Sequence, residues 1–273
     1  MSRSASFDPA RSGDEWRFFA TVGRAARSRA GFALTVLACG LGVFRELLRP
    51  ASWHRPVRAE LRRSLSQAVG GGLVTTIVAG GLVGIAMVYE ALFWLGEVGE
   101  ERLVGSILVS VLVREVAPVL VGLILLGRSG AATAEMSELH PGHQLDSLNR
   151  QGIDPFLLLV LPRAVAFAIA SYTLGVVFVA TALTVGFTAG RVGGNVVMSS
   201  WEFSSTVLGA MRPADFVIFP SKMLAIGMLV AITSVLTGLE GSGRDRASDR
   251  LPRTFTRGTL AIMVTSLVLS LTI

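Results

Sequence analysis

Long, mostly apolar runs, separated by short polar segments rich in arginine, set the pattern of this chain. About 18–20 consecutive apolar residues are enough to cross the hydrocarbon core of a bilayer as a helix, and four runs reach that length. A fifth run at the C-terminus is shorter. The pattern predicts an all-α membrane protein with five transmembrane helices, at about residues 69–95, 103–127, 156–190, 216–239 and 255–273.

The region before the first predicted span is basic. Residues 1–30 are polar and are predicted to form a cytoplasmic tail. The apolar run from Gly31 to Phe44 is short for a full span, and arginines bracket it as anionic headgroups would favour. A second basic amphipathic stretch follows from Arg55 to Gln67. We therefore expect interfacial or amphipathic helices over residues 31–67, with two alternatives for residues 31–44, which either lie on the bilayer or re-enter it.

The placement of arginine predicts the orientation. If the N-terminus is inside, twenty arginines lie on the cytoplasmic side and three on the other side. Cytoplasmic loops of membrane proteins carry an excess of Lys and Arg. We therefore expect a cytoplasmic N-terminus and a C-terminus on the opposite face.

Composition removes several classes of function. Charged residues make up 16% of the chain, against roughly 25% in soluble domains. The net charge of +6 comes from arginines beside apolar runs, so no nucleic-acid partner is expected. Cys39 is the single cysteine, and His140 and His143 have no further clustered ligands, so no metal site is predicted. No phosphate-binding loop or nucleophile elbow occurs, so we expect neither catalytic residues nor a cofactor bound by this chain.

Arg114 and Glu115 are charged residues near the middle of the second predicted span. Charges inside a membrane are costly and usually face a bundle interior, a cavity or a partner. Pro118 would interrupt the helical hydrogen bonds nearby, and a broken helix with charges at depth is typical of transport sites. We predict that Arg114, Glu115 and Pro118 line a cavity. The alternative, a span that starts near Val116, leaves too few residues before Gly127 to cross the bilayer.

Gly80 and Gly84 form a small-xxx-small pair in the first span. Such a pair lets another helix approach closely, and the approach is either within one chain or between two copies. The segment between the second and third spans is predicted to hold a short helix that Gly152 and Pro155 end. This helix either docks in a groove of a cytoplasmic partner or is a solvated connector.

Six short motifs in the middle of the chain occur in one order: Arg114-Glu115-Val-Ala-Pro118, Gly127-Arg128-Ser-Gly130, Ala134-Glu135, Gln144-Leu-Asp146-Ser-Leu148, Gly152-Ile-Asp154-Pro155 and Pro162-Arg163. Together they resemble the signature of the MlaE/YrbE family, the permease subunits of MCE-type ABC lipid transporters. The strong part of the resemblance covers about residues 110–165, and the span pattern extends it over about residues 31–273.

This resemblance implies an MlaE-type permease fold over residues 31–273 in the bacterial inner membrane, with the C-terminus in the periplasm. It implies a homodimer, cytoplasmic ATPase subunits that use ATP and Mg, a periplasmic MCE-domain protein and a possible small cytoplasmic accessory subunit. The cargo would be a phospholipid or a related hydrophobic molecule, held beside Arg114 and Glu115. A coupling helix at about residues 134–152 would contact the ATPase through Glu135, His143, Gln144, Asp146 and Leu148.

The chain also departs from the family pattern. His143 replaces the usual Glu of the coupling helix, Ser137 replaces a Gly, and the loop at residues 241–257 is longer and more charged. Two other functions stay open at this point. One is a stand-alone secondary transporter that couples ions through Glu115 or Lys222, and the other is a membrane scaffold that transports nothing.

Overall fold

The computed structural model describes residues 27, 30–99, 103–139, 150, 154–194, 198–239 and 247–271. Within these ranges the regular structure is helical and contains no strand. The first helix runs from Ala30 to Leu47. The later elements are the 3-10 helix η1 (Pro50–Ser52), the π-helical segments η2 (Ile85–Tyr89), η3 (Leu108–Val116) and η4 (Phe156–Val160), and the α-helices α2 (Arg55–Gly84), α3 (Glu90–Val98), α4 (Leu103–Ile107), α5 (Ala117–Leu139), α7 (Leu161–Val192), α8 (Ser200–Ala210), α9 (Asp215–Leu239) and α10 (Ala247–Leu271).

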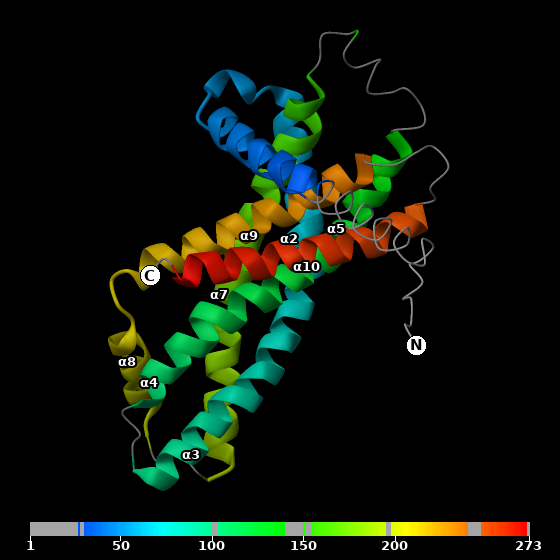
Figure 1. Cartoon of the computed structure of the whole chain (residues 1–273). Coiled ribbons are helices and arrows are strands. Elements are labelled where there is room, and N and C mark those ends of the chain that lie inside the picture. The colour runs from blue at the N-terminus through cyan, green and yellow to red at the C-terminus, as the bar shows by residue number, and fades with distance from the viewer. Residues whose placement is uncertain are drawn as a thin grey trace, which may run out of the picture.

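Three of the long helices change their winding without ending. α2, η2 and α3 follow one another without a break from Arg55 to Val98, α4, η3 and α5 do the same from Leu103 to Leu139, and so do η4 and α7 from Phe156 to Val192. The predicted amphipathic stretch from Arg55 to Gln67 forms the first turns of the same continuous helix as the first predicted span. Its interfacial position stays a prediction. Figure 1 shows α3, α4 and α8 together at one end of the molecule, and the helix Ala30–Leu47 at the other end.

Six helices in the described part of the chain are long and apolar enough to cross a membrane: Ala30–Leu47, Arg55–Val98, Leu103–Met136, Phe156–Val192, Asp215–Leu239 and Leu251–Leu271. The predicted all-α membrane class is confirmed. The helix Ala30–Leu47 has 18 residues. At about 1.5 Å per residue this length approaches the roughly 30 Å of the hydrocarbon core, so the count of five spans stays a prediction.

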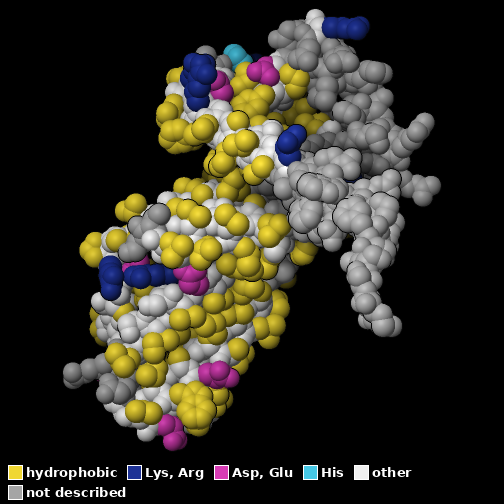
Figure 2. All heavy atoms as spheres, in the orientation of Figure 1, with side chains coloured by type: hydrophobic (Ala, Val, Ile, Leu, Met, Phe, Trp, Pro, Cys, Tyr) yellow, Lys and Arg dark blue, Asp and Glu magenta, His cyan; other side chains and the backbone are white. Residues whose placement is uncertain are grey.

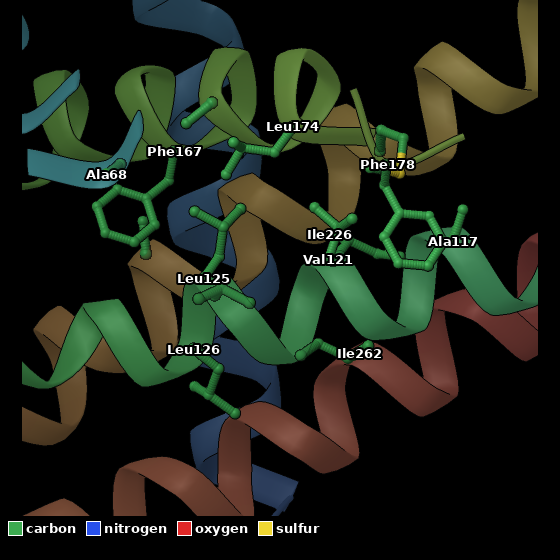
Figure 3. Close-up of a cluster of buried hydrophobic side chains, with 14 of the residues drawn as sticks. Ala68, Ala117, Val121, Leu125, Leu126, Phe167, Leu174, Phe178, Ile226 and Ile262 are labelled. Atoms are coloured by element: carbon green, nitrogen blue, oxygen red, sulfur yellow. The ribbon is translucent and has the colours of Figure 1, made fainter. Parts of the chain in front are cut away.

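The core forms where α2, α5, α7, α9 and α10 cross (Figure 3). α7 packs along both α2 and α9, and α5 packs along α9 and α10. Because these helices bury apolar side chains from several directions, their relative positions are fixed by close packing. The side chains that meet there include Ala68, Val121, Leu125, Phe167, Leu174, Phe178, Ile226 and Ile262.

Glycines allow α2 and α7 to approach closely. A Cβ atom on Gly80 would lie 2.9 Å from the carbonyl oxygen of Phe178, and one on Gly84 would overlap the backbone of Ala182. Gly186 on α7 faces the backbone of Gly84 in the same way. Of the two alternatives for the Gly80–Gly84 pair, the structure therefore has the contact within one chain.

The surface reflects the bilayer. Figure 2 shows a broad apolar surface over most of the described residues, with basic and acidic side chains near the end that carries the N-terminal helix and acidic side chains at the opposite end. One group of basic and acidic side chains lies inside this apolar surface, close to the C-terminal end of α10. A charged group at that level needs partners or a cavity, because lipid tails supply no hydrogen bonds.

Candidate functional site

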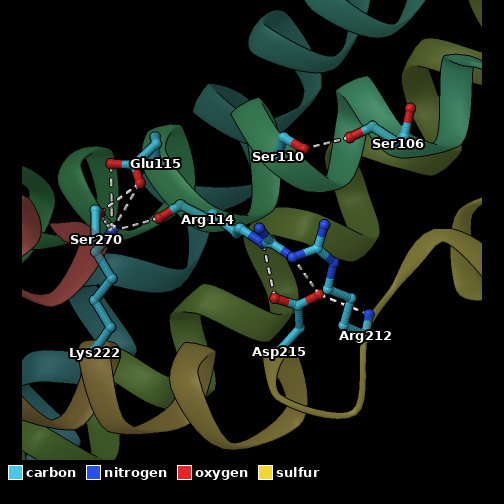
Figure 4. Close-up of polar contacts among 8 residues, drawn as sticks. All are labelled: Ser106, Ser110, Arg114, Glu115, Arg212, Asp215, Lys222 and Ser270. Atoms are coloured by element: carbon cyan, nitrogen blue, oxygen red, sulfur yellow. Dashed lines mark hydrogen bonds and ion pairs between the residues drawn. The ribbon is translucent and has the colours of Figure 1, made fainter. Parts of the chain in front are cut away.

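The first part of this charged group is an ion pair between the second long helix and α9 (Figure 4). Arg114 Nε lies 2.7 Å from Asp215 Oδ1, and Arg114 Nη2 donates to Asp215 Oδ2 at 2.8 Å. The backbone N–H of Arg212 also donates to Oδ2, at 2.8 Å. The side chain of Asp215 is 2% exposed and that of Arg114 is 27% exposed. Asp215 is thus a buried carboxylate whose charge is balanced by a guanidinium that still reaches the surface.

The second part joins η3, α9 and α10 around Lys222. The Nζ atom of Lys222 lies 3.2 and 3.3 Å from the two carboxylate oxygens of Glu115, and 2.7 Å from Ser270 Oγ. Ser270 in turn donates to Glu115 Oε1 at 2.6 Å, and Ser266 Oγ lies 3.5 Å from Oε2. Here the cation is the buried partner, because Lys222 is 2% exposed and Glu115 is 47% exposed.

Lys222 also binds the backbone. Its Nζ donates to the carbonyl oxygen of Arg114 at 2.6 Å. Arg114 lies close to the point where the π-helical winding of η3, in which the N–H of Ala117 donates to the carbonyl oxygen of Leu112, gives way to α5. With α-helical bonding from there on, the carbonyl oxygen of Arg114 would accept from the N–H of residue 118. That residue is Pro118, which has no N–H. The ammonium group therefore stands where the proline removes a helical donor.

A cavity of about 170 Å³ opens between these groups. Its wall includes charged, hydroxyl and apolar side chains. The residues that line it are Ser110, Val113, Arg114, Glu115, Asp215, Ile218, Phe219, Lys222, Leu269 and Ser270. A volume of this size holds a small polar group. A guanidinium has five N–H donors, and the contacts of Arg114 with Asp215 engage only part of them.

The predicted site residues divide as follows. Arg114 and Glu115 line the cavity together, whereas Pro118 is buried next to it and does not form its wall. Sequence reasoning missed Asp215, which stands at the end of a mixed loop, and considered Lys222 only for ion coupling. The available signal for Lys222 was a lone lysine in an apolar run of a chain whose other basic residues are all arginine. For Asp215 there was no local signal, because its partner is 101 positions away.

A second polar cluster ties α2, α5 and α7 together. The Nη2 atom of Arg163, whose side chain is 4% exposed, lies 2.8 Å from Glu135 Oε2 and 3.1 Å from Glu60 Oε1. Arg63 lies 3.9 Å from the other carboxylate oxygen of Glu135, which is 40% exposed. Glu135, predicted to contact an ATPase, is therefore also engaged inside its own chain.

The other predicted coupling residues, His143, Gln144, Asp146 and Leu148, lie outside the described residues, as do His140 and the segment 141–149. Their contact with an ATPase stays a prediction. Glu135 and Arg163 come shortly before and after this segment, so their ion pair joins the two helices from which it extends.

Comparison with known proteins decides the family. The family described as "Permease MlaE" matches residues 61–272. The chain belongs to the MlaE permease family. The resemblance seen in the motifs is thus confirmed, and it extends from the start of the first long helix almost to the C-terminus.

Individual relatives of this MlaE-family chain share between 25% and 29% of its residues over the matched segments. The chloroplastic protein TRIGALACTOSYLDIACYLGLYCEROL 1 of Arabidopsis thaliana is 25% identical over 221 residues, which is 78% of this chain and 59% of that protein. A probable ABC transporter permease of Rickettsia prowazekii is 29% identical over 145 residues, covering 50% and 53%. The intermembrane phospholipid transport system permease protein MlaE of Haemophilus influenzae is 29% identical over 131 residues, covering 48% and 47%. The chain thus matches about half the length of these curated relatives.

Proposed function

We propose that this chain is the membrane-spanning permease subunit of an ATP-driven transporter that moves phospholipids or related hydrophobic molecules. The observation that carries the proposal is the charged cavity of Arg114, Glu115, Asp215 and Lys222, which lies among membrane-length helices of an MlaE-family chain. Relatives named as ABC transporter permeases and as a phospholipid transport permease support it.

The cavity would hold the headgroup of a lipid, and the adjoining part of the tails would reach the apolar side chains of its lining. Lipid tails would lie against apolar side chains such as Ile218, Phe219 and Leu269. A phosphate would accept hydrogen bonds from Arg114, whose planar guanidinium suits phosphate oxygens. Asp215 would keep that guanidinium in place between transport cycles, because it contacts two of its nitrogen atoms. No bond is made or broken in this chain.

The energy would come from a separate subunit. The sequence has no Gly-x-x-x-x-Gly-Lys-Ser/Thr loop. ATP and Mg would therefore be used by a cytoplasmic ATPase, which would dock at residues 134–152. Two copies of the chain would form the membrane core in the inner membrane, with their N-termini in the cytoplasm and an MCE-domain protein on the periplasmic face. ATP would shift the dimer between two cavity shapes.

Native co-purification from the source membrane tests this proposal. We expect an ATPase and an MCE-domain protein to accompany the chain, and mass spectrometry of the extract to find bound lipid. Recovery of the chain without an ATPase, from membranes in which it is active, would reject the proposal.

Two controls separate the other functions. A secondary transporter would move its cargo in vesicles that contain the purified chain and an ion gradient but no ATP. A scaffold would tolerate charge reversal at both Arg114 and Glu115, whereas a lipid pathway would be impaired by it.

A further inference from the structure

We propose that Lys222 is a positioning residue of the lipid site. Its ammonium group replaces the backbone donor that Pro118 removes, and it thereby fixes the junction of η3 and α5 so that Arg114 faces Asp215 and the cavity. The proposal deepens the transport function proposed above and rests on it for its activity readout.

The first argument is distance. The contact between Lys222 Nζ and the Arg114 carbonyl oxygen measures 2.6 Å, whereas the contacts with the carboxylate of Glu115 measure 3.2 and 3.3 Å. A lysine that served only as a counter-ion would be expected to approach the carboxylate most closely. The ammonium group has three donors, and the shortest contact goes to the backbone.

The second argument is the geometry of α9. Asp215 and Lys222 are seven residues apart, so they lie on the same face of the helix, two turns from each other. α9 therefore contacts Arg114 at two points, at its guanidinium through Asp215 and at its carbonyl oxygen through Lys222. Two contacts to one residue define both the position of its backbone and the direction of its side chain.

The third argument is the irregular winding around Arg114. η3 is π-helical over Leu108–Val116, and α5 begins at Ala117, immediately before Pro118. A change of winding next to a proline weakens the backbone hydrogen bonds that would otherwise hold the helix in one shape. The junction needs a contact from another helix, and the buried amine of Lys222 supplies it.

Three variants separate positioning from charge balance. Glu115→Gln keeps Lys222 on the carbonyl oxygen of Arg114. Glu115→Gln with Lys222→Met removes both charges together, so no buried charge is left alone. Adding Pro118→Ala to that double variant restores a backbone N–H that can donate to Arg114. ATP-driven lipid transport is measured in vesicles at equal amounts of folded complex, and ATP hydrolysis is measured in parallel.

We expect the double variant to transport lipid about tenfold more slowly than Glu115→Gln alone, the effect of losing one hydrogen bond to a charged group. ATP hydrolysis should continue in the double variant, and Pro118→Ala should recover most of the lost transport. Equal transport by Glu115→Gln and the double variant would overturn the proposal, as would a failure of Pro118→Ala to recover transport. If the double variant does not fold, the yield of folded protein replaces transport as the readout. Adding Pro118→Ala should then recover most of the lost yield, and a failure to do so would overturn the proposal.

A readout that needs no transport keeps the two proposals distinct. Ser110 lines the cavity one turn before Arg114. In a Cys39→Ser background, a Ser110→Cys thiol should react with maleimide at a rate that changes several-fold when Lys222 is lost and returns when Pro118 is replaced. An unchanged labelling rate rejects the positioning role. If the unmodified complex moves no lipid, the transport function fails, while the labelling rates still decide the role of Lys222.

Discussion

Replacing Asp215 by alanine removes the buried counter-charge of Arg114. In the structure, Asp215 is 2% exposed and contacts Arg114 through two nitrogen atoms, at 2.7 and 2.8 Å. It also accepts the backbone N–H of Arg212 at 2.8 Å. The variant therefore leaves a guanidinium and a backbone donor without their acceptor.

The expected loss of stability follows from these contacts. Removing one partner of a buried ion pair costs about 3–5 kcal/mol. Arg114 is 27% exposed, so water screens part of the loss and about 2–3 kcal/mol is a better expectation. The lost contact with the Arg212 N–H adds about 1 kcal/mol. Asp215→Ala should thus destabilise the protein by about 3–4 kcal/mol, and Asp215→Asn, which keeps one acceptor oxygen, by about half as much.

Thermal unfolding of the purified protein in detergent measures this loss. At about 2–4 °C per kcal/mol for a chain of this size, we expect Asp215→Ala to lower the Tm by roughly 6–16 °C. A double-mutant cycle with Arg114→Met should give a coupling energy of about 2 kcal/mol, because the second change removes the orphaned charge. A Tm within about 1 °C of the unmodified protein, or additive effects in the cycle, would refute the reasoning.

Three further predictions concern the packing, the second polar cluster and the partner. Gly84→Ala should destabilise the protein by about 2 kcal/mol or more, because a Cβ atom at residue 84 would overlap the backbone of α7. Gly70→Ala is the control on the same helix, because a Cβ atom at residue 70 would have no neighbouring atom within 4 Å. This control should be neutral or stabilising in the same unfolding assay. Arg163→Met should cost about 2–4 kcal/mol, because it removes the buried cation that contacts both Glu60 and Glu135 and leaves Glu135 only the longer contact with Arg63. Glu135→Gln should cost about 1 kcal/mol, and denaturant unfolding compares the two variants. A cysteine at Gln144 should crosslink to the ATPase in the active complex, and its failure to capture one would reject the coupling-helix assignment.

The class of the fold could be predicted because hydrophobic length is a strong signal. An apolar run that can cross a bilayer leaves few alternatives to a helix, since every backbone group must be paired inside it. The start of the first long helix was not predicted, because the basic, amphipathic composition of residues 55–67 set them apart from the apolar run that follows. Gly70, Gly71 and Gly72 lie where the two parts of this helix join. Each glycine costs a helix about 1 kcal/mol relative to alanine. Here Leu174 packs against Gly72 and Arg128 lies against Gly71, so packing with neighbouring helices outweighs the low helix propensity.

The site could be predicted only in part. Arg114 and Glu115 could be predicted because a charge within a membrane-spanning segment is energetically costly and usually faces a cavity or a partner. Their partners, Asp215 and Lys222, are 101 and 107 positions away, and only the packing of α9 against η3 brings them close. The role of Pro118 also depended on the structure. The sequence predicted a helix loosened by Pro118. It did not predict that the amine of Lys222, on another helix, would donate a hydrogen bond to the carbonyl oxygen of Arg114.

Lipid movement in reconstituted vesicles tests the central claim most directly. The chain would be placed in vesicles with the ATPase that co-purifies with it, and the transfer of labelled phospholipid would be followed after addition of ATP and Mg. We predict transfer that requires ATP hydrolysis and that falls about tenfold when Arg114→Met removes the cavity guanidinium, as expected for one lost charge-assisted hydrogen bond. Transfer driven by an ion gradient without the ATPase, or no transfer by an assembled complex that hydrolyses ATP, would contradict the account.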